Sequence, residues 1–153
     1  MIRQMSHTTI YVLDQDSAKA FYTEKLGFEA RFDISIDEVF EGAGQGFRWL
    51  TVSPKEQPDL QIVLSSCGMG RTPEQAEELR ALVASGGIGA GVMMTDDCQQ
   101  TYKELSAQGV TFLSEPTERP YGIEAMMRDD SGNMISLTQP FAFAFDPEAP
   151  TGA

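Results

Sequence analysis

The chain has 153 residues, of which 41% are hydrophobic and 22% are charged, and it carries a formal net charge of −12. This composition is typical of a globular protein with a core, and no uncharged apolar run is long enough to predict a transmembrane helix. The acidic charge argues against nucleic acid and anionic membranes as partners and favours neutral or cationic ones.

The N-terminal segment and the cysteines bear on the compartment. Residues 1–5 lack the apolar segment of a signal peptide, so we expect a cytoplasmic protein. Cys67 and Cys98 form no CxxC pair, and the simplest interpretation is two idle thiols in a reducing compartment. The only histidine is His7, which excludes a site that needs two imidazoles from one chain.

The first half of the chain predicts a strand, a helix and three more strands. β-branched and aromatic residues favour a strand over 5–13, and the turn 14–16 supplies an N-cap for a helix that Gly27 ends. Alternating apolar residues predict the remaining strands at 28–36, 47–53 and 60–65.

A connector helix follows, and then the pattern starts again. Thr72 and Gln75 form a capping box around Pro73, which predicts a helix that ends at Gly86. The second half then predicts a strand at 88–95, a helix from the cap at 96–97 to about Ala107, and strands at 110–113, 122–128 and 134–138.

The two halves align as a repeat. The alignment pairs Asp16 with Asp96 and Tyr22 with Tyr102 at an offset of 80, and Gly27 with Gly109 at an offset of 82, so we expect a second helix two residues longer. We therefore predict an α+β fold in which two βαβββ modules form a cupped, mixed, eight-stranded sheet with the helices outside. The expected boundaries are 1–67 for the first module, 68–86 for the helical connector, 87–140 for the second module and 141–153 for a C-terminal tail.

The tail carries three alternating phenylalanines, Phe141, Phe143 and Phe145. We expect them to pack across a sheet edge or on a partner subunit. A module that docks on another protein through this tail is one of three functional interpretations.

The last hairpin has a distinctive turn, Asp130-Ser131-Gly132-Asn133. The hairpin 128–137 resembles the aspartate-proline-aspartate-glycine-asparagine hairpin of the vicinal oxygen chelate superfamily, although Asp130 stands where proline is usual. The segment 12–17 running into 21–28, which ends in Leu-Gly-Phe, and the paired modules are also similar to this glyoxalase/bleomycin-resistance/extradiol dioxygenase group. The resemblance covers roughly residues 5–139 and implies that group's fold.

The resemblance also implies where a metal would be bound. Family members with a metal use a His or Gln that opens the first strand of each module and a Glu on the last strand of each. These positions hold His7, Gly87 at the offset of 80, Ser136, and Val63 or, one pair away, Gln61. Such donors are too poor in charge for Zn²⁺, Ni²⁺ or Fe²⁺, so we expect no metal and no cofactor.

A sheet without metal ligands can still line a ligand cavity. Aromatic and methionine walls with a few hydroxyl groups suit a flat, mostly apolar ligand. The expected ligand-binding residues are His7, Thr9, Tyr11, Trp49, Tyr121, Met126, Arg128 and Ser136. The plainer interpretations stay open: a strand-end histidine bonded to a neighbour, core packing for Trp49 and the methionines, and ion pairs from Arg48 and Arg128 to Glu124.

The leading functional hypothesis is a metal-free protein that binds an antibiotic-like or aromatic small molecule, as a homodimer. The alternative is a metal-dependent lyase, isomerase or dioxygenase of the same superfamily. Such an enzyme would use His7 or a displaced metal, held by carboxylates that a domain-swapped dimer brings together, such as Glu38, Glu41 or Glu124. The sequence leaves open whether catalysis occurs.

Overall fold

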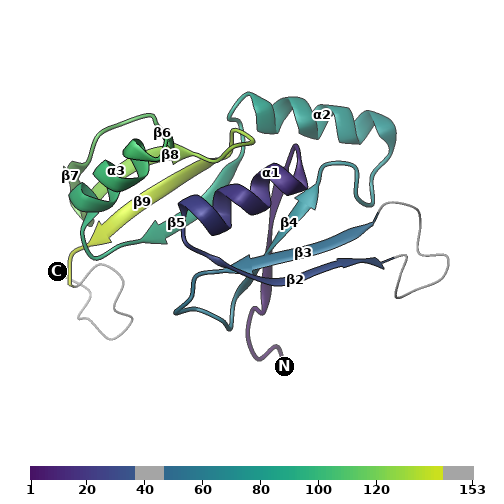
Figure 1. Cartoon of the computed structure of the whole chain (residues 1–153), viewed down its shortest axis with the longest axis horizontal. Coiled ribbons are helices and arrows are strands. Elements are labelled where there is room, and N and C mark those ends of the chain that lie inside the picture. Colours follow the sequence, from purple (N-terminus) through teal and green to yellow (C-terminus); the bar gives the residue numbers. More distant parts are fainter. Residues whose placement is uncertain (37–46, 143–153) are drawn as a thin grey trace. The chain divides into compact units, whose positions relative to one another are not determined.

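The computed structural model describes residues 1–36 and 47–142, and the chain divides into two compact units (Figure 1). The first unit contains Met1–Gly87 and the three turn residues Asp130–Gly132. The second unit contains Ile88–Asp129 and the described residues from Asn133 onward. Each unit is built around one β-sheet.

The sheet of the first unit has four strands in the order β1-β4-β3-β2, with β1 parallel to β4 and the other pairs antiparallel. The elements of this unit are β1 (His7–Val12), α1 (Gln15–Ala20), the π-helical turn η1 (Phe21–Lys25), β2 (Glu29–Ser35), β3 (Arg48–Ser53), β4 (Gln61–Ser66) and α2 (Pro73–Ala84).

Local chemistry explains where these helices begin and end. Asp14 caps α1 through a 2.7 Å bond from the Ser17 amide, and Gly27 follows the helical segment at a φ of 72°. The capping box of α2 is confirmed, because Thr72 and Gln75 each accept a hydrogen bond from the other's backbone amide.

One face of the first sheet packs against α1, which lies on β3 and β4. The apolar residues of that face alternate along the strands and are buried; they include Ile10, Val12, Leu50, Val52 and Leu64. The opposite face, turned away from the helix, is called the first distal face below.

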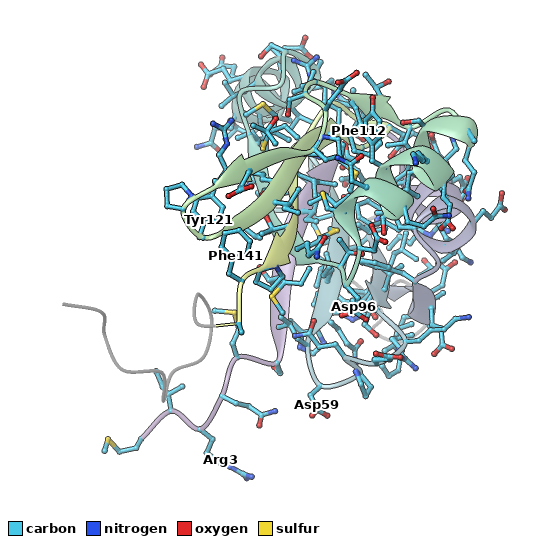
Figure 2. All side chains as sticks on the ribbon, turned by 90° about the vertical axis from the view of Figure 1, so that its left-hand side faces the viewer. Arg3, Asp59, Asp96, Phe112, Tyr121 and Phe141 are labelled. Atoms are coloured by element: carbon cyan, nitrogen blue, oxygen red, sulfur yellow. The ribbon has the colours of Figure 1, made fainter. Side chains whose placement is uncertain are left out.

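The second unit repeats the plan, with a sheet order of β5-β9-β8-β6 and a short strand β7 that also pairs with β8. Its elements are β5 (Gly89–Met94), α3 (Cys98–Ala107), β6 (Thr111–Phe112), β7 (Thr117–Arg119), β8 (Gly122–Arg128) and β9 (Met134–Pro140). Its core joins Cys98, Ala125 and Leu137 to the rings of Tyr102 and Phe112, which meet edge to face at 4.6 Å (Phe112 is labelled in Figure 2).

The α+β class and the repeated order of elements are confirmed, with two differences. The described residues form nine strands rather than eight, because β7 was not predicted. The offset of 80 is wrong: the N-caps are Asp14 and Asp97, and the first strands open at His7 and Gly89, so the true offset is 82 to 83. The second helix, 98–107, is therefore not longer than the first, 15–25.

The turn of the last hairpin is held by two sets of bonds. Asp129 accepts from both the backbone and the side-chain amide of Asn133, each at 2.9 Å. Within the first unit, Ser131 Oγ accepts from the Leu13 amide at 2.9 Å, and Ser17 Oγ donates to Asp130 at 2.7 Å. Asp130, which stands where the family has proline, is thus used as an acceptor.

None of the helices in the described part of the chain is long and apolar enough to cross a membrane.

Candidate functional site

The first distal face carries the polar and aromatic residues of three neighbouring strands. The β1–β4 register places His7 beside Gln61, Thr9 beside Val63 and Tyr11 beside Ser65. Thr51 of β3 is the partner of Val63, so alternation brings Trp49 of the same strand to this face. The structure therefore gathers His7, Thr9, Tyr11 and Trp49, four of the residues expected from the sequence.

Two aromatic contacts shape this face. The rings of His7 and Trp49 lie 5.8 Å apart at an interplanar angle of 52°. The guanidinium of Arg71 lies over the Tyr11 ring at 4.4 Å, a cation–π distance, and is steadied by a 3.1 Å bond to the Met69 carbonyl. Each contact presents a π surface next to a polar group.

Hydroxyl and amide groups lie on the same face as the rings. Thr51 Oγ1 donates to Gln61 Oε1 at 2.7 Å and also accepts from the Phe32 amide at 3.2 Å. Phe32 and Ile34 of β2 pair with Thr51 and Trp49, and both remain exposed, at 51% and 39%. The face therefore ends in an uncovered apolar margin beside the tryptophan.

His7 itself has a modest environment. Its Nδ1 lies 3.0 Å from Ser6 Oγ, and the residue is exposed. In the ranges 1–36 and 47–142 no carboxylate forms an ion pair with His7. Within the described part of the chain the imidazole therefore has no orienting acid of the kind that a general base would use. It offers a ring surface and one hydrogen-bonding nitrogen.

A charged cluster braces α1 against β2 and β3. Arg48 contacts Asp33 with two nitrogens, at 2.7 and 3.0 Å, and Asp16 at 2.7 Å, while Lys19 reaches Asp33 at 2.6 Å. The hydrogen bonds from Arg48 and Lys19 hold the pKa of the Asp33 carboxyl well below its usual range. The expected pairing of Arg48 with Glu124 is wrong, because Asp33 and Asp16 take all three of these contacts.

This cluster predicts an acid-sensitive contribution to stability. A lowered pKa in the folded state stabilises the protein above the unfolded pKa of about 4, and that stabilisation is lost as pH falls below about 5. Asp33→Asn should reduce the free energy of unfolding by about 1 kcal/mol at pH 7, since the pair is partly exposed, and the difference should shrink as pH falls from about 5 toward 2.

Urea unfolding at pH 7, 5, 3 and 2 measures this difference. Asp59→Asn is the matched control, because Asp59 is exposed and forms no ion pair within the described residues (labelled in Figure 2). If the free energy of unfolding of D33N stays below that of the wild type by a constant amount across this pH range, the ionised Asp33 carboxylate is not the source of the stabilisation.

The second unit presents its own distal face, turned away from its core. Alternation along β8 places Glu124, Met126 and Arg128 on this face. The partners of these three residues on β9 are Thr138, Ser136 and Met134, and the next strand adds Met94 and Val92.

Glu124 is the centre of a hydrogen-bonded chain on this face. Ser136 Oγ donates to Glu124 Oε2 at 2.7 Å and lies 2.9 Å from Thr138 Oγ1. Arg119 Nε lies 3.8 Å from Glu124 Oε1, and a hydrogen bond to Glu124 raises the pKa of the Tyr121 hydroxyl. Glu124 therefore pairs with Arg119. The sequence had suggested Arg128 as its partner instead.

Tyr121 and Phe141 lie side by side where β8 begins (Figure 2), and the Phe141 amide donates to the Tyr121 carbonyl at 3.0 Å. This contact places the start of the C-terminal tail next to Tyr121. Phe143 and Phe145 lie outside the described residues, so the interpretation of the tail as a docking segment rests on the sequence alone.

The family's metal positions do not form a fitting donor set. Gly87 precedes β5; Gly89 instead opens that strand and, like Gly87, supplies no side chain. Ser136 and Val63 supply no charge, and within the described ranges no three His, Cys, Asp or Glu residues are grouped to hold a metal ion. Glu124 could add one carboxylate beside Ser136, whereas Glu38 and Glu41 lie outside the described residues.

Several residues of the two faces were not among those expected from the sequence. Arg71 and Met69 sit in a glycine-containing connector without periodicity, so no pattern placed them near Tyr11. The role of Glu124 depends on the β8–β9 register, although its alternation with Met126 was visible. Phe32 and Ile34 could have been placed from strand alternation once the β2–β3 pairing was known.

Comparisons with known proteins agree with this architecture. The sequence model of the Glyoxalase/Bleomycin resistance protein/Dioxygenase superfamily matches residues 4–137. The chain is 35% identical over 133 residues to the protein YurT of Bacillus subtilis (strain 168), covering 86% of this chain and 95% of that protein.

Solved structures extend the comparison. The crystal structure of UcmS2 is 49% identical with a TM-score of 0.80, covering 90% of this chain and 98% of that one. The crystal structure of TnmS3, an antibiotic binding protein from Streptomyces sp. CB03234, is 30% identical with a TM-score of 0.69, covering 92% and 98%. The fold is therefore that of a glyoxalase/bleomycin-resistance protein.

The chain belongs to the Glyoxalase/Bleomycin resistance protein/Dioxygenase superfamily.

Proposed function

We propose that this protein binds an aromatic, antibiotic-like small molecule reversibly and releases it unchanged. The observation that carries the proposal is the first distal face. It combines the ring pair of His7 and Trp49 and the cation–π pair of Tyr11 and Arg71 with hydroxyl and amide groups. Flat ligands gain most from such surfaces, because aromatic stacking adds to the burial of apolar area. The likeness to TnmS3, an antibiotic binding protein, supports the same ligand class.

Binding without conversion follows from what the described side chains can do. A lyase or dioxygenase of metal-dependent type needs a Lewis acid, and the residues at the family's ligand positions do not fit one. A metal-free enzyme would need a positioned base, and among the described residues His7 has only Ser6 as a hydrogen-bonding neighbour. Sequestration requires only a surface that is complementary to the ligand, and the first distal face offers one.

A homodimer in the cytoplasm is part of the proposal. Phe32, Ile34, Val92 and Met94 are large apolar residues exposed on the two distal faces, and a second copy of the chain would reduce that exposure. The two free, buried cysteines suit a reducing compartment. Sedimentation equilibrium should give twice the mass of one chain.

A thermal-shift screen tests the ligand class. A compound that binds only the folded protein raises its melting temperature, and ligand at a hundred times its Kd adds about 2.7 kcal/mol of stability. We expect at least one polycyclic aromatic antibiotic to raise the melting temperature and to quench the fluorescence of Trp49, the single tryptophan. If no aromatic compound does either, the proposal fails.

A further inference from the structure

One nitrogen of the Arg128 guanidinium is a donor that the fold buries without a hydrogen-bond partner. Its Nε is buried and has no hydrogen-bond partner. A charged donor in this state has lost its water without gaining an acceptor, which is unfavourable unless another molecule supplies one. A bound molecule that carries a hydrogen-bond acceptor would therefore satisfy the Nε of Arg128.

The nearest acids along β8 and its turn are already engaged. Asp129 accepts two hydrogen bonds from Asn133. Glu124 accepts from Ser136 and pairs with Arg119. Neither carboxylate accepts a hydrogen bond from the Nε of Arg128, which has no partner among the described residues.

The residues around Arg128 indicate the chemistry of the rest of the ligand. Met134 is its cross-strand partner, and Met126 lies two residues away on the same face. Two residues along a strand span about 7 Å, which a fused two-ring system can cover. Thioether side chains are flexible and polarisable and make favourable contacts with aromatic rings. Val92 and Met94 of the neighbouring β5 are 58% and 64% exposed, so the apolar surface continues across the sheet.

We propose that the second distal face binds a fused aromatic acid, with its carboxylate or phenolate oxygen on Arg128 and its ring on Met126 and Met134. This inference rests on the proposed function and adds an anionic group to its aromatic ligand class, on a surface of the second unit. The chain as a whole is acidic and would not by itself select an anion. The charge-assisted bond to Arg128 supplies the selection, and the methionines supply most of the contact area.

A matched pair of probes tests the proposal in the full-length protein. Isothermal titration calorimetry compares 2-naphthoate with 2-naphthamide, which has the same ring and no charge. Naphthoate should bind at least about tenfold more tightly, and Arg128→Met should lower its affinity roughly 10- to 100-fold while leaving naphthamide unchanged. Arg119→Met is the control, since it removes the same charge from a half-exposed arginine that already has a partner, and it should preserve the preference.

The outcomes separate this inference from the proposed function. The inference is overturned if the wild type binds naphthoate and naphthamide with equal affinity, or if the preference for naphthoate persists in R128M. Failure of both probes to bind, while an aromatic antibiotic still quenches Trp49, also overturns it and leaves the proposed function standing. If no aromatic compound binds at all, both fail. The unliganded R128M protein should melt at or above the wild-type temperature, because the substitution removes an unsatisfied buried donor; a lower melting temperature would mean that Arg128 supports the fold instead.

Discussion

Trp49→Ala should weaken binding of an aromatic ligand about 10- to 100-fold, the largest functional effect that we expect from one substitution. The indole is the widest ring on the first distal face and is held in place by His7 at 5.8 Å. Its truncation removes both stacking and apolar contact, losses that commonly reach 1–3 kcal/mol at a binding surface. Calorimetry is the suitable measurement, because the variant has no tryptophan fluorescence.

Two further variants separate stacking from general damage. Trp49→Phe keeps an aromatic face and should retain affinity within about threefold. Leu82→Ala removes a large side chain that is 47% exposed on α2 and should leave binding unchanged. Equal affinity of W49A and wild type, with both proteins folded, would place the ligand elsewhere.

Gly132→Ala should destabilise the protein by about 3 kcal/mol, the largest expected effect on stability. Gly132 adopts a φ of +110°, and a Cβ there would lie 2.7 Å from the Val83 carbonyl oxygen. A left-handed backbone costs a residue with a side chain about 1 kcal/mol, and overpacking against rigid backbone adds about 1–3 kcal/mol. Urea unfolding at neutral pH measures the difference.

Gly70→Ala is the control for this experiment. Gly70 has a φ of +70°, but a Cβ there meets nothing within 4 Å. The free energy of unfolding of G70A should therefore fall only by the cost of the left-handed backbone conformation, about 1 kcal/mol. If G132A is no less stable than G70A, the close approach of the turn to the end of α2 is not what constrains Gly132.

Features set by neighbouring residues could be predicted from the sequence. Asp14 and the pair Thr72–Gln75 cap helices through bonds that span three residues. The hairpin around 130–133 was recognisable because its turn chemistry is local. The alternation of His7, Thr9 and Tyr11 on one face follows from the period of a strand, and the structure confirms it.

Features set by register and by loops could not be predicted. Matching Asp16 to Asp96 by residue type gave the wrong offset, because one aspartate lies inside its helix and the other precedes the cap. The partner of Glu124 depends on which residue of β9 faces it, and the partner of Arg48 depends on how β2 pairs with β3. Neither pairing can be predicted from a short segment of the sequence.

The central claim is that the protein holds an aromatic compound without changing it and without a metal. Native mass spectrometry of protein treated with a chelator, mixed with the strongest ligand from the thermal-shift screen, tests this claim most directly. We predict a complex with one ligand per binding site, from which the compound is released at its original mass after prolonged incubation. Loss of binding after chelation that an added divalent metal restores, or release of a compound of altered mass, would contradict the claim and favour a metal-dependent enzyme.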